Sequence, residues 1–186
     1  MKQAEDQQIL DWISSKDQKE KGFRSLVEKY KEKLYWHVRR MVLNHDDADD
    51  VLQNTFIKVY KSIDHFEGKS SLYTWLYKIA TNETFTYLDK NKKYSYDTME
   101  DSEDHPAIKN LKTDPLYDGD EIQFHLERAI GTLPDKQKVV FKMRYYEETP
   151  YREIAQILDT SEGALKASYH HAIKKIEEYF KTKELL

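Results

Sequence analysis

Residues 149–176, TPYREIAQILDTSEGALKASYHHAIKKI, constrain the fold of this chain more than any other stretch. Pro150 suits the first turn of a helix, because a missing N–H costs nothing there, and Thr149 before it is expected to be the N-cap. Asp159 is a typical turn residue, and Ser161 two positions later can cap a second helix. The segment therefore predicts two short helices joined by a tight turn.

Both predicted helices have one apolar face, because large aliphatic residues recur at a spacing of three to four. The inward-facing residues are Ile154, Ala155, Ile157, Leu158, Leu165, Tyr169, Ala172 and Ile176. The opposite face of the second helix carries Gly163, Ala167, His170, His171 and Lys174, with Lys166 at its edge. A polar helix held across a shorter helix is the geometry that enters a DNA major groove. An ordinary helical hairpin has the same pattern, so the segment alone leaves both interpretations open.

The rest of the chain is also expected to be helical. Only five glycines and four prolines occur in 186 residues, and apolar residues repeat at helical rather than alternating spacing. We predict helices near residues 9–13, 23–42, 44–66, 71–89 and 135–146. The aspartates of NHDDADD fall in the first turn of the third helix, where the helix dipole favours negative charge. The fold class predicted is all-α.

The net charge of −4 is distributed unevenly along the chain. Residues 1–93 carry 17 Lys/Arg and 15 Asp/Glu, and residues 128–186 carry 11 and 9. Residues 94–127 carry only 2 Lys/Arg against 10 Asp/Glu, and helical periodicity fails through most of this segment. We therefore predict two small helical domains, residues 1–93 and 121–186, joined by an acidic flexible linker at 94–120.

Several classes of function find no support. The absence of cysteine excludes a disulfide framework, a cysteine-zinc site and a thiol nucleophile. There is no glycine-rich phosphate loop and no serine in a nucleophile motif, so we expect no enzyme and no cofactor. The adjacent His170 and His171 cannot aim at one metal ion from a helix, so we expect no metal site. The glutamates Glu147 and Glu148 are expected to form a solvated helix end.

The N-terminus and hydropathy predict a cytoplasmic protein without membrane insertion. Glu5 and Asp6 stand where a signal peptide needs apolar residues, and every charge-free run is too short to span a bilayer.

Two long segments resemble one protein family. DADDVLQNTFIKVYKSIDHFEGKSSLYTWLYKIATN resembles region 2 of the bacterial RNA polymerase sigma factors, and the extracytoplasmic-function (ECF) group has the most similar pattern. LPDKQKVVFKMRYYEETPYREIAQILDTSEGALKASYHHA resembles region 4 of the same proteins. The two segments occur in the family's order and together cover most of the chain. The resemblance implies a transcription initiation factor that binds core RNA polymerase and promoter DNA, and that an anti-sigma factor can hold inactive.

The resemblance also implies three binding surfaces. Core polymerase would contact Asp50, Gln53, Phe56 and Tyr60 on the third helix. Unpaired bases of the minus-ten element would contact Lys69, Ser70, Tyr73, Trp75, Lys78 and Asn82. The mixture of rings and cations in that second set suits single-stranded DNA in its own right, although we expect only some of Tyr73, Trp75 and Tyr77 to reach DNA. The minus-thirty-five element would be read by Ser161, Gly163, Ala164, Lys166, Ala167, His170, His171 and Lys174.

Two other functions stay open at this point. A sigma mimic would bind an anti-sigma factor without touching DNA, but known mimics carry a receiver domain, for which this chain has no room. A helix-turn-helix repressor would need a dimer interface and would leave the N-terminal domain unexplained.

Overall fold

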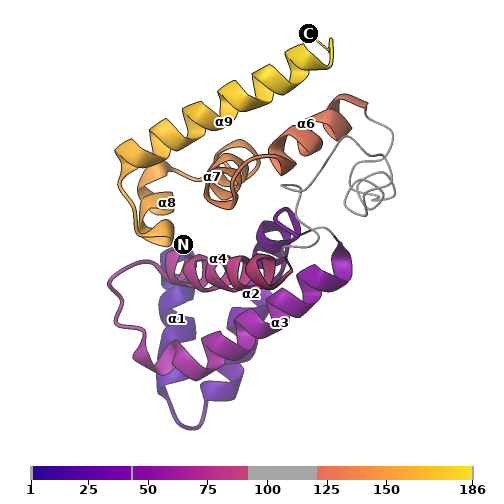
Figure 1. Cartoon of the computed structure of the whole chain (residues 1–186). Coiled ribbons are helices and arrows are strands. Elements are labelled where there is room, and N and C mark those ends of the chain that lie inside the picture. Colours follow the sequence, from indigo (N-terminus) through magenta and orange to yellow (C-terminus); the bar gives the residue numbers. More distant parts are fainter. Residues whose placement is uncertain (1, 43, 92–120, 186) are drawn as a thin grey trace.

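The computed structural model describes residues 2–42, 44–91 and 121–185, and all regular structure within these ranges is helical (Figure 1). The all-α prediction is therefore confirmed. The acidic linker predicted at 94–120 lies outside the described residues. The N-terminal unit consists of α1 (Lys2–Ser14), α2 (Lys19–Arg39), α3 (His45–Ser62), a 3-10 turn η1 (Ile63–His65) and α4 (Leu72–Lys90). The C-terminal unit consists of α6 (Glu121–Gly131), α7 (Asp135–Tyr145), α8 (Tyr151–Leu158) and α9 (Glu162–Thr182).

Side-chain caps fix where three of the helices begin. Asn44, Ser71 and Ser161 each accept a hydrogen bond from the backbone N–H three residues later, at 2.8, 3.1 and 3.2 Å. Such a cap stabilises a helix by about 1 kcal/mol. The cap predicted for Ser161 is confirmed, whereas the one predicted for Thr149 is wrong. Pro150 itself holds the cap position of α8 with extended backbone angles, so the helix begins one residue later than expected.

The N-terminal unit packs α1, α3 and α4 around α2. Its most deeply buried residues lie at helical spacing on facing surfaces: Leu26, Leu34, Val38, Val59, Leu76 and Ala80. Gly22 lies where α2 passes closest to α1, because a Cβ added there would come within 2.7 Å of the backbone nitrogen of Ile13. The close approach of these two helices therefore requires glycine at this position.

The C-terminal unit contains the predicted pair of helices and their turn. Asp159 adopts the left-handed conformation, with φ 48° and ψ 51°, and so reverses the chain between α8 and α9. Asp tolerates this conformation better than most residues, because its short side chain bonds locally. The second helix is longer than predicted and reaches Thr182. Its inner face packs on α6 and α7 through Ala172 and Ile176.

The two units pack against each other, which the sequence did not indicate. In Figure 1 the C-terminal unit lies above the N-terminal unit, with α8 nearest to α4, and these two helices are in contact. One hydrophobic cluster runs through both units. Its members from the C-terminal unit are Val139, Val140, Met143, Ile154, Ile157 and Leu165. Across the described ranges, no helix has the length and apolar character needed to cross a membrane.

Candidate nucleic-acid interface

The residues predicted to read double-stranded DNA lie at the cap of α9 and along the helix, and one of them, Ala164, lines a cavity between α9 and α4. All eight are exposed: Ser161, Gly163, Ala164, Lys166, Ala167, His170, His171 and Lys174. The opposite side of the helix is anchored by the buried Leu165, so the exposed face has a fixed orientation. A Cβ built at Gly163 would meet no atom within 4 Å. The start of α9 is therefore open to close approach by another molecule.

The charge on this face of α9 is low. Lys166 lies 5.8 Å from the Tyr151 ring, and Lys174 is exposed near the middle of the helix. Arginine, which presents a rigid fork to guanine, is absent from α9. The arrangement suits contact with thymine methyl groups and groove shape more than guanine recognition.

The aromatic residues of α4 divide between core and surface. Tyr77 is buried, and burial raises the pKa of its hydroxyl group far above the usual range. Its ring lies 4.1 Å from that of Tyr73, which is half-buried and whose pKa is also raised by burial. Trp75 is half-buried against Phe66, with the two ring centroids 5.3 Å apart. Of the three aromatic residues, only Tyr73 and Trp75 therefore keep exposed surface.

The polar residues expected at the minus-ten surface have different surroundings. Lys69 and Asn82 are exposed, and Ser70 is partly exposed next to the Ser71 cap. We had expected Lys78 to be free for DNA. Its Nζ instead lies 2.6 Å from Oδ2 of Asp159, in the turn between α8 and α9. The lysine expected to meet DNA phosphates thus meets a carboxylate of the same chain.

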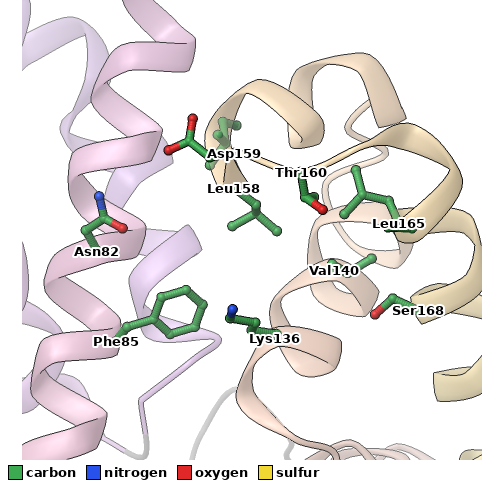
Figure 2. Close-up of a pocket in the computed structure, with 11 residues that line it drawn as sticks. Asn82, Phe85, Lys136, Val140, Leu158, Asp159, Thr160, Leu165 and Ser168 are labelled. Carbon is green, nitrogen blue, oxygen red and sulfur yellow. The ribbon is translucent and has the colours of Figure 1, made fainter.

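A cavity of about 440 Å³ lies between α4 and the C-terminal unit. Figure 2 shows Asn82 and Phe85 on α4 facing Leu158, Val140 and Lys136 across this space. The contact between the two units is therefore not fully packed at this end of α4.

A polar contact between the units was missed by sequence reasoning. His37 is 2% exposed and lies on the inner face of α2. Its Nδ1 is 3.0 Å from Oε1 of Glu147, and its Nε2 is 2.9 Å from the hydroxyl oxygen of Thr81. Arg40 lies 3.7 Å from the same glutamate oxygen. We had expected Glu147 and Glu148 to form a solvated helix end. This is wrong for Glu147, which makes these contacts between the units, whereas Glu148 is exposed. The sequence did contain a signal for the burial of His37, because this residue follows the buried Leu34 by three positions and so lies on the same face of α2.

The exposed face of α3 carries the residues predicted to contact polymerase. Asp50 and Gln53 are exposed, Phe56 is half-buried and Tyr60 is 50% exposed. Ile57, which we did not predict, is 46% exposed on the same face. Residues 50, 53, 57 and 60 follow one helical face, so the spacing alone could have identified Ile57. Among the described residues, no group of three or more His, Asp or Glu side chains could hold a metal ion.

Comparison with known proteins places the chain in a family. The profile of Sigma-70 region 2 matches residues 26–94, and the profile of Sigma-70 region 4 matches residues 124–176. The chain is 32% identical to the ECF RNA polymerase sigma-E factor of Haemophilus influenzae, over 94% of this chain and 95% of that protein. It is 30% identical to the RNA polymerase sigma-H factor of Pseudomonas aeruginosa, over 95% and 94%. The chain therefore belongs to the ECF family of RNA polymerase sigma factors.

Two solved structures have a similar fold. The sigma factor RpoE of Bartonella quintana, in complex with the anti-sigma factor NepR, matches with a TM-score of 0.63 at 23% identity, covering 87% of this chain and 98% of that one. CnrH in complex with the cytosolic domain of CnrY matches with a TM-score of 0.66 at 16% identity, covering 97% of each chain.

Proposed function

We infer that this protein is a transcription initiation factor that binds core RNA polymerase and directs promoter recognition and opening. The observation that carries this conclusion is the presence of region 2 and region 4 in one chain, in that order, with sigma-factor relatives aligned over nearly its whole length. This role belongs in the cytoplasm, where the chromosome and polymerase lie. Its contribution is positioning and strand capture, and we assign the chain no catalytic step.

Each binding surface has a proposed role. The face of α3 around Asp50, Gln53, Phe56 and Tyr60, extended by Ile57, would bind core polymerase. Its two exposed apolar side chains, Ile57 and Tyr60, are the kind of surface that a partner protein covers.

The two DNA-binding surfaces differ in chemistry. On α4 and the loop before it, Lys69, Ser70, Tyr73, Trp75, Lys78 and Asn82 would hold unpaired minus-ten bases, with rings stacking on bases and lysines following phosphates. On α9, the exposed face from Ser161 to Lys174 would enter the major groove at the minus-thirty-five element.

An anti-sigma factor is a further proposed partner. The sigma factor RpoE, which has this fold, was solved in complex with the anti-sigma factor NepR, and CnrH, which also has this fold, was solved in complex with the cytosolic domain of CnrY. By family membership, we propose that this chain is held inactive in the same general way.

Run-off transcription tests the proposed function most simply. Purified core polymerase is incubated with genomic fragments, with and without the chain, and the transcripts are sequenced. We expect new start sites that share upstream elements only when the chain is present. Failure to produce any transcript, together with binding to an anti-sigma factor, would instead support the sigma mimic. Tight operator binding without polymerase would support the repressor.

A further inference from the structure

We propose that the cavity between α4 and the C-terminal unit binds a small organic anion that has an apolar body. The cavity volume of about 440 Å³ lies within the range of about 300–1,000 Å³ that is usual for small-molecule sites. Residues of α4, α7, α8 and α9 line the cavity, so both units contribute to the site. Ligand binding itself is independent of the proposed function, whereas its consequence for promoter binding rests on that function.

The inner wall of the cavity is apolar and belongs to the hydrophobic core. Val140 of α7, Ile157 of α8 and Leu165 of α9 are each 2% exposed and are members of one cluster. Phe85 of α4 and Leu158 of α8 are half-buried, and they face each other across the remaining space (Figure 2). An apolar body placed here would be removed from water on several sides, which favours binding.

Polar side chains lie at the opening of the cavity. Asn82, Lys136 and Thr160 are exposed, and Ser168 is half-buried. Within the part of the chain that the structure describes, these four side chains have neither a hydrogen-bond partner nor an ion-pair partner. Each therefore keeps its hydrogen-bonding capacity for a molecule that enters from solvent.

The charge at the opening favours an anion. Asp159 is the only acid among the described residues that line the cavity, and its two carboxylate oxygens lie 2.7 and 2.6 Å from Nζ of Lys78. The chain itself therefore balances the charge of this carboxylate. Lys136 carries the other charge in the lining, and the acid next to it, Asp135, pairs instead with Lys138 at 3.4 Å. The Lys136 ammonium group is thus available to a ligand anion.

The composition of the cavity is that of a ligand site rather than that of a packing defect or a water pocket. An empty defect in a core is lined by apolar side chains, and a buried water needs two to four polar partners. Here a buried apolar wall is combined with exposed polar side chains from both units. Small-ligand sites have this form, in which a few polar groups orient a ligand that is held mainly by apolar contact.

A bound ligand would cover residues that are proposed to contact promoter DNA. Asn82 belongs to the proposed minus-ten surface and Ala164 to the proposed minus-thirty-five surface, and both line the cavity. Ligand and DNA would therefore weaken each other's binding, and this coupling is reciprocal. The ligand is thus expected to lower transcription directed by this chain.

Two fluorescent probes test the site in the full-length chain. Anilinonaphthalene sulfonate joins a sulfonate anion to aromatic rings, and N-phenylnaphthylamine has the same rings without the anion. Lys136→Gln removes the cation, and Ser168→Phe fills part of the cavity. The matched control, Lys175→Gln, removes the same charge at an exposed lysine outside the cavity lining. Fluorescence titration gives the dissociation constant of each probe, and circular dichroism verifies that each variant is helical.

We expect both probes to bind the unmodified chain and the control equally well. Lys136→Gln should weaken the sulfonate probe about two- to fivefold, as for one partly exposed ion pair, and should leave the neutral probe unchanged. Ser168→Phe should weaken both probes about tenfold or more. Sulfonate binding that is the same in all four chains, or absent from the unmodified chain, would overturn the site. An equal loss of both probes in Lys136→Gln would overturn the anionic class of ligand. Because Lys136 is exposed, its variant keeps the test decisive if Ser168→Phe fails to fold.

Run-off transcription separates this site from the proposed function. Each chain is assayed with core polymerase, with and without the sulfonate probe at a concentration near its dissociation constant for the unmodified chain. The probe should lower the transcript yield of the unmodified chain and of the control more than that of Lys136→Gln. An equal effect on all chains, or no effect, would overturn the competition with DNA. No transcript in the absence of the probe would overturn the sigma-factor role, while the fluorescence titration would still decide whether the ligand site exists.

Discussion

Lys142 and Glu127 form a buried ion pair in the C-terminal unit. We predict that substitutions of these two residues are strongly coupled in their effects on the free energy of unfolding. Their side chains are 7% and 5% exposed, and Nζ lies 2.9 Å from Oε2. Each ion also has a second partner, since Tyr146 donates to the other glutamate oxygen at 2.6 Å and Lys142 donates to the carbonyl of Arg40. Loss of one member of such a pair leaves a buried charge and costs about 3–5 kcal/mol.

The perturbation is Lys142→Met, Glu127→Gln and the two together. Each single change should lower the free energy of unfolding by about 3–5 kcal/mol, because the remaining ion stays buried without its counter-ion. In the double variant neither charge remains, and the amide oxygen introduced by Glu127→Gln still accepts the hydrogen bond from Tyr146. We expect the double variant to lose no more than either single variant, which corresponds to a coupling energy of about 3 kcal/mol or more.

Urea unfolding of the full chain, followed by circular dichroism, measures all three variants under the same conditions. Simple addition of the single losses would reach about 6–10 kcal/mol, which is comparable to the whole stability of a typical domain. An unfolded or additively destabilised double variant would therefore refute the reasoning. A folded double variant with a midpoint at or above those of the single variants would support it.

Three further predictions address separate parts of the molecule. Gly22→Ala should destabilise the N-terminal unit by about 1–3 kcal/mol in urea unfolding, because the added Cβ would meet the α1 backbone at 2.7 Å; a neutral result would contradict that close approach. Asp50→Ala combined with Gln53→Ala should weaken competition for core polymerase with unchanged helical content, and undiminished competition would remove α3 from the polymerase interface. In a selection from random promoters by the polymerase complex, a change at Ala167 should shift base preference by about 1–3 kcal/mol at one position, whereas Lys174→Ala should weaken all sequences about equally. If the Ala167 variant selected the same preferred element as the Lys174→Ala variant, α9 would not be the helix that reads the minus-thirty-five element.

Local features of the fold could be predicted from the sequence because their causes are local. Ser161 caps the helix that follows it through an atom only three residues away, and Asp159 turns the chain with its own backbone angles. Helical spacing also separated the buried Leu165 from the exposed Ala167 and His170. In each case neighbours along the chain determine the environment of the residue.

The contacts between the units could not be predicted, because their partners are distant in sequence. His37 and Glu147 are 110 positions apart, and Lys78 and Asp159 are 81 apart. Spacing rules describe which face of a helix a residue occupies, but they do not identify which other helix that face meets. Glu147 was therefore expected in solvent, and Lys78 was expected to be free for DNA.

Footprinting of promoter DNA by the free chain and by its complex with core polymerase tests the central claim most directly. The DNA is a promoter recovered from run-off transcription, and protection is mapped in moderate salt. We predict protection at two segments about 25 base pairs apart only when chain and core polymerase are both present, since each unit is nearly neutral and binds DNA phosphates weakly by itself. Strong protection by the free chain alone, or an unchanged polymerase footprint when the chain is added, would contradict the assignment of this protein as a sigma factor that reads promoters together with core polymerase.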